Sequence, residues 1–167
     1  MKKGFTMIEL IFVIVILGVL ASVAIPRLAA TRDDAEVAKA ATNLTTAVSD
    51  LTAYYTAKGH FKSTASANKN MSDFTKFTNA LNKEGKLNVK GKTTCVEVTL
   101  PALAANNQQT SGAVNLTLKF KTSADPVCKQ LATLPGIKTM CGKGESENIS
   151  NDGTCTIQIG GSGGIQF

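Results

Sequence analysis

The sequence predicts an α+β fold in which a long N-terminal α-helix packs on a small head built around an antiparallel β-sheet. Three observations support this prediction. Residues 5–25 form an apolar run, residues 26–58 repeat apolar residues at helical spacing, and residues 59–167 contain alternating strand patterns. The 167 residues leave room for one head of ordinary size. The net charge is +6. Because the chain has one histidine, multi-histidine metal sites are excluded.

The apolar run at residues 5–25 has the length and composition of a membrane-spanning helix. At about 1.5 Å per residue it spans roughly 32 Å, close to the roughly 30 Å of a bilayer core. Lys2 and Lys3 precede it, so the positive-inside rule predicts a cytoplasmic N-terminus and an external head. A secretory signal peptide is the alternative. It is disfavoured because Glu9 lies inside the run, where a carboxylate costs roughly 2.5–3.5 kcal/mol and marks a functional position by default.

Beyond this run, the helix is expected to continue in water over residues 26–58. Pro26 removes one backbone donor and disfavours helical geometry before it, which predicts a kink or thin spot. Gly59 is expected to end the helix after about Ala57. Apolar residues return at alternating spacings of four and three: Val37, Ala41, Leu44, Val48, Leu51 and Tyr55. They form one stripe, which is suited to packing on a sheet.

The head, residues 59–167, is predicted to contain an antiparallel sheet of three or four strands. Alternating apolar and polar residues indicate strands at 95–100, 114–121 and 155–159. Before them, Ser72 is expected to cap a short helix that Gly85 ends and that presents Phe74, Phe77 and Leu81.

Four cysteines lie in the head: Cys95, Cys128, Cys141 and Cys155. An even count in an exported domain predicts two disulfides, with three possible pairings. We favour Cys128–Cys141 closing one loop and Cys95–Cys155 joining two strands, each contributing roughly 3–4 kcal/mol in the chain-entropy model. A structural zinc site is the rival. It is disfavoured because no two cysteines lie two to four residues apart and no histidine is near them in sequence.

The first residues also match a known pattern. Lys2-Lys3-Gly4 followed by Phe5-Thr6-Met7-Ile8-Glu9-Leu10 resembles the class III leader and N-terminal helix of type IV pilins and type II secretion pseudopilins. The resemblance implies that a prepilin peptidase cuts between Gly4 and Phe5 and that Phe5 is then N-methylated. Residues 1–4 are thus the leader, and Glu9 stands fifth in the mature chain, where the family places its glutamate. Gly18 and Pro26 fall where the family's helices melt locally in the filament.

The function implied by the resemblance is that of a structural filament subunit and not of an enzyme. Such subunits are stored in the inner (cytoplasmic) membrane with the head in the periplasm or outside. An assembly ATPase and a platform protein polymerise them into a homo-oligomeric filament together with minor pseudopilins. There, Glu9 is expected to pair with the amine of a neighbouring Phe5 and set the axial register. The filament is expected to serve protein secretion or DNA uptake, or alternatively to be a surface pilus for adhesion or motility.

The loop that follows Gly142 is rich in oxygen ligands, among them Glu145, Glu147 and Asp152. Major pseudopilins hold calcium in a C-terminal loop, so calcium is a candidate ligand by resemblance. The spacing does not follow the EF-hand, and a solvated loop is the alternative. No other cofactor is expected.

Lys83, Lys86, Lys90 and Lys92 lie within ten residues, with only Glu84 opposing them. Clustered positive charge attracts phosphate, so this run is a candidate DNA-contacting patch, as in a DNA-binding competence protein. A solvated surface is the alternative. Catalysis is not expected, because His60 has no nucleophile beside it in sequence and no phosphate-binding loop occurs.

Overall fold

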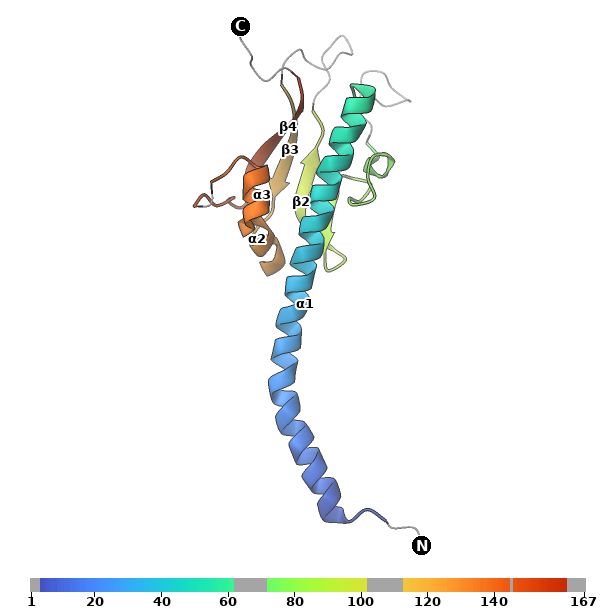
Figure 1. Ribbon diagram of the computed structural model, residues 1–167, viewed down its shortest axis with the longest axis vertical. Coiled ribbons are helices and arrows are strands. Elements are labelled where there is room, and N and C mark those ends of the chain that lie inside the picture. Colours follow the sequence, from blue (N-terminus) through green and yellow to red (C-terminus); the bar gives the residue numbers. More distant parts are fainter. Residues whose placement is uncertain (1–3, 62–71, 102–112, 145, 162–167) are drawn as a thin grey trace. The chain divides into compact units, whose positions relative to one another are not determined.

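A computed structural model describes residues 4–61, 72–101, 113–144 and 146–161 (Figure 1). Its elements are α1 (Met7–Lys58), the 3₁₀ helix η1 (Phe74–Lys76), β1 (Lys86–Val89), β2 (Thr93–Thr99), β3 (Val114–Phe120), α2 (Pro126–Thr133), α3 (Pro135–Met140) and β4 (Thr154–Gly160). The predicted α+β layout is confirmed, since a long N-terminal helix is followed by an antiparallel sheet. The chain divides into two compact units, residues 1–35 and 36–167, and α1 contributes to both.

The second half of α1 provides one wall of the core of the second unit. Its buried residues are Val37, Ala40, Leu44, Ala47 and Leu51, while Ala41, Val48 and Tyr55 are partly buried. The predicted stripe is therefore confirmed, and two alanines widen it. Gly59 ends the helix as predicted: its φ is 72°, and its N–H donates to the Tyr55 carbonyl at 2.6 Å.

The sheet has the strand order β1-β2-β3-β4, and each neighbouring pair is antiparallel. On β3, Val114, Leu116, Leu118 and Phe120 are buried and alternate with half-exposed polar residues, as the sequence predicts. These side chains join the α1 stripe in one hydrophobic cluster. Figure 1 shows the second half of α1 running along the sheet, with α2 and α3 also packed beside the strands.

Three parts of the head differ from the sequence prediction. The short helix is a single 3₁₀ turn, and its cap is Asp73, whose side chain accepts from the Thr75 N–H, and not Ser72. Gly85 does not end a helix but leads into β1; a Cβ there would lie 2.6 Å from the Phe74 ring, so only glycine fits. The strand β1 and the helices α2 and α3 were not predicted. For α2, the missed signal is Asp125-Pro126, an N-cap residue followed by proline in the first turn.

Candidate functional site

The start of α1 is held by a reciprocal pair of side chains, Thr6 and Glu9. The Thr6 backbone N–H and the Thr6 hydroxyl both donate to Glu9 Oε2, at 2.8 and 2.7 Å. In return, the Glu9 N–H donates to Thr6 Oγ1 at 3.4 Å. This is a capping box, in which the residue before the helix and its third residue satisfy each other's backbone donors. Sequence reasoning missed it, although Thr-x-x-Glu directly before an apolar run is its signature.

The capping box leaves half of the Glu9 carboxylate open. Both Thr6 bonds go to Oε2, and none of the residues that the structure describes donates to Oε1. A carboxylate oxygen can accept more than one hydrogen bond, so the group retains the capacity to bind a second partner.

The bond between Gly4 and Phe5 lies just outside this capped helix. Both residues are exposed and precede the first helical residue, Met7, and Phe5 is 87% exposed. Nothing described comes within 4 Å of a Cβ built on Gly4. Cleavage there leaves Thr6 and Glu9 in place, so the capping box survives the loss of residues 1–4.

The helix that follows is apolar on all sides. One helix in the described residues, α1, is long and apolar enough to cross a membrane, and its apolar window lies near the N-terminus. Its large hydrophobic side chains from Phe5 to Leu28 are all exposed. The helix runs through Gly18 and Pro26 without a break, and the kink or thin spot expected there stays a prediction. Pro26 still removes the bond that the carbonyl of Ser22 would accept.

The start of the chain matches a known motif. A family model described as the prokaryotic N-terminal methylation motif matches residues 1–25. The chain carries a class III prepilin-like leader of the type IV pilin and pseudopilin family. No curated protein and no solved structure matches it. The leader thus supports a pilin-type subunit, and the match does not extend into the head.

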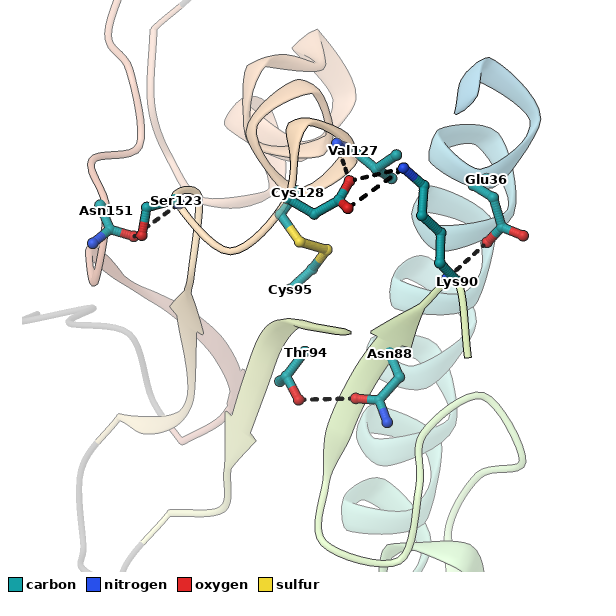
Figure 2. The surroundings of a disulfide bond; sticks show 10 residues. Glu36, Asn88, Lys90, Thr94, Cys95, Ser123, Val127, Cys128 and Asn151 are labelled. Carbon is teal, nitrogen blue, oxygen red and sulfur yellow. Dashed lines mark hydrogen bonds and ion pairs between the residues drawn. A yellow bond between two sulfur atoms is a disulfide. The ribbon is translucent and has the colours of Figure 1, made fainter. Parts of the chain in front are cut away.

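The disulfides of this pilin-like chain correct the pairing that we favoured. The structure joins Cys95 to Cys128 and Cys141 to Cys155, so both favoured pairs are wrong (Figure 2). Cys95 and Cys155 belong to β2 and β4, which β3 separates. Two strand spacings are about 10 Å, beyond the roughly 7 Å that a disulfide spans between Cα atoms.

A bulge in β2 orients Cys95 toward its partner. The register of β1 and β2 shifts between Leu87, opposite Val96, and Asn88, opposite Thr94, so Cys95 is the extra residue. Cys95 and Val96 are therefore both buried, although strict alternation would place them on opposite faces. The two bonds tether α2 to β2 and the end of α3 to β4.

Two of the four lysines in the candidate DNA patch are paired within the head. The Lys86 ammonium donates to Glu84, a hydrogen bond that raises the pKa of Lys86 and lowers that of Glu84. Lys90 Nζ lies 3.2 Å from Asp125 Oδ1, and its backbone N–H donates to Glu36 Oε2 at 3.4 Å (Figure 2). Lys83 and Lys92 are exposed. Because carboxylates neutralise half of the cluster, its attraction for phosphate is weaker than the sequence indicates.

Two acidic residues of the candidate calcium loop are also paired within the head. Glu145 lies outside the described residues. Glu147 accepts from the Gly144 N–H at 3.1 Å and pairs with Lys143, while Asp152 pairs with Lys119 at 3.4 Å. Within the described ranges, no group of three His, Cys, Asp or Glu side chains is arranged to hold a metal ion.

An open groove of about 360 Å³ lies between the second half of α1 and the start of α3. Its lining is apolar or small: Ala41, Thr42, Thr45, Leu134, Pro135, Gly136 and Ile137. The leader motif at residues 1–25 points to a structural subunit.

Proposed function

We propose that the chain is a structural subunit of a type IV pilus-like or type II secretion-like filament. Prepilin peptidase cleaves it between Gly4 and Phe5 and methylates Phe5, and an assembly platform polymerises it from the inner membrane. The observation behind this proposal is the methylation motif at residues 1–25, which opens an apolar helix of membrane-spanning length. Before assembly, lipid covers this helix; in the filament, the helices of other copies cover it.

Glu9 would direct the transfer from membrane to filament. In the bilayer its open Oε1 has no water to bond, which is costly. The amine of a neighbouring processed Phe5 supplies the missing donor together with the opposite charge. If a subunit is shifted along the filament axis, the Glu9 carboxylate and the Phe5 amine both lose their partner. The ion pair therefore selects the axial position of the subunit.

Variants at Glu9 separate this role from helix capping. Glu9→Gln keeps a capping box, because glutamine serves at this helix position, but it has no charge. Glu9→Ala removes both the cap and the charge. We expect both variants to be processed normally and incorporated into filaments at least 10-fold less than wild type. Thr6→Ala, which keeps the carboxylate, should be incorporated.

The measurement is the ratio of mature chain in sheared or purified filaments to mature chain in the membrane. Glu84→Gln, the same change on the surface of the head, is the matched control and should assemble like wild type. Wild-type incorporation of Glu9→Gln would show that Glu9 acts as a cap alone, against the proposal.

The use of the filament in secretion or DNA uptake is tested in a strain deleted for this gene, with the intact gene restored as control. Loss of labelled double-stranded DNA uptake, rescued on restoration, would favour a competence filament. Normal uptake with loss of an exported protein from the medium would favour secretion.

A further inference from the structure

The two edge strands of the sheet, β1 and β4, differ in whether other residues bond their outward-facing backbone groups. At the β1 edge, Asn82 bonds both backbone groups of Lys86: its side-chain Oδ1 accepts from the Lys86 N–H at 2.8 Å, and its N–H donates to the Lys86 carbonyl at 3.1 Å. The strand is also short, with four residues. These are the features by which proteins prevent an edge from pairing with another chain.

The β4 edge has no such partner over residues 154–158. The bulge of β4 lies beyond them, because Ile159 is the extra residue between Gln158, opposite Asn115, and Gly160, opposite Val114. The Phe120 N–H donates to the Gly153 carbonyl, so in this antiparallel ladder the bonded positions on β4 continue at Cys155 and Ile157. The backbone groups of the alternate residues, Thr154, Thr156 and Gln158, therefore point away from β3. None of the described residues bonds them on that side.

The side chains of β4 also leave this edge open. The strand reads Thr-Cys-Thr-Ile-Gln-Ile-Gly and contains no charge and no proline, in a chain with a net charge of +6. Thr154, Thr156 and Gln158 are exposed, and Ile157 is only partly buried. Because β4 itself carries no charged side chain, two copies of this strand would not repel each other electrostatically.

We propose that the free edge of β4 pairs with β4 of a second copy of this chain, antiparallel about a two-fold axis at Thr156. In that register Thr156 faces its counterpart and Thr154 faces Gln158, so every pair on the exposed face is neutral and polar. On the other face Ile157 meets Cys155, which covers a partly exposed apolar side chain. The β1 edge is less suited to this pairing, because Asn82 already bonds the backbone of Lys86 there.

This contact is self-complementary and closes on itself, so it joins two subunits without generating a polymer. Its use rests on the proposed function: subunits whose polymerisation depends on α1 would use the β4 edge to join one filament to another.

Cysteine crosslinking of the full chain in detergent micelles tests the pairing. All four native cysteines are in disulfides, so Thr156→Cys adds a lone free thiol. Across the proposed axis the two Cα atoms lie about 5.5 Å apart, within disulfide reach. With diamide as oxidant, we expect Thr156→Cys to form a covalent dimer at least 10-fold faster than Thr99→Cys. Thr99 is the matched control because it is also exposed, on the inner strand β2. Equal rates would overturn the inference.

A charge variant separates this inference from the proposed function. Thr156→Lys places two ammonium groups across the axis, and we expect it to assemble normally but to lose lateral association of filaments in electron micrographs, while Thr99→Lys keeps it. Lateral association that persists in Thr156→Lys would overturn the pairing. Failure of the wild-type chain to enter filaments would contradict the proposed function alone, and the crosslinking rates would still decide the pairing.

Discussion

The two halves of α1 form one continuous helix but differ in how their apolar residues are distributed and in what covers them. In the first half every large hydrophobic side chain is exposed, for example Leu17 at 58%, whereas in the second half Leu44 and Leu51 are completely buried. The first half is apolar on every side, and the second has one apolar stripe. The comparison shows that a stripe finds its partner within the subunit, in the sheet, while an all-round apolar helix needs lipid or other copies.

The largest expected effect comes from truncating the same residue type in each half. Leu44→Ala should lower the free energy of unfolding of the head by about 2–5 kcal/mol, because it leaves a cavity in a packed core. Leu17→Ala should leave that free energy unchanged. Urea unfolding of the full chain in micelles measures both, followed by the near-ultraviolet circular dichroism of Tyr54 and Tyr55, which pack against Phe61. Equal losses for the two variants would contradict the comparison.

The disulfides sharpen the comparison, because they stabilise only the head. The Cys95–Cys128 and Cys141–Cys155 bonds close segments with sequence separations of 33 and 14. Replacing each pair by serine should cost about 4 and about 3 kcal/mol in the chain-entropy model. The same unfolding experiment measures these losses, and helicity of the first half should persist. If the shorter loop gave the larger loss, native-state packing and not chain entropy would set the order.

The smallest effect concerns Asp125, which caps α2 and pairs with Lys90. The hydrogen bond from the Val127 N–H, followed by that from Lys90, lowers the pKa of Asp125 below its ordinary 3.8. A lowered folded-state pKa means that Asp125 contributes its stability in full above about pH 4 and loses it as pH falls through the lower folded value. Asp125→Ala should lower the melting temperature by a few degrees at pH 7 and by less at pH 2.

Asp125→Asn is the control for this prediction, because asparagine also caps helices but does not titrate in this range. It should melt close to wild type at pH 7, with a weaker loss on acidification. A gap between wild type and Asp125→Ala that stays constant from pH 7 to pH 2 would contradict the assignment.

Much of the fold follows from local patterns in the sequence. The apolar run, the stripe from Val37 to Tyr55 and the alternation in β3 each express a period of 3.6 or 2, which is visible along the chain. The leader motif is local as well. The capping box of Thr6 and Glu9 was equally visible, and it was missed because Glu9 was considered as a charge in the membrane and not as a helix cap.

The sequence by itself therefore determined the long helix, the all-round apolar character of its first half and the single apolar stripe of its second half. It also determined three of the strands and the processing motif. The tertiary structure alone decided which cysteines pair, which lysines are neutralised and which sheet edge stays open. Cys95 pairs with Cys128 because β3 separates it from Cys155 and a bulge reorients it. Lys90 finds Asp125, 35 residues away, because the β1–β2 turn reaches the start of α2. Periodicity depends on neighbours in sequence, whereas these contacts depend on strand order and register.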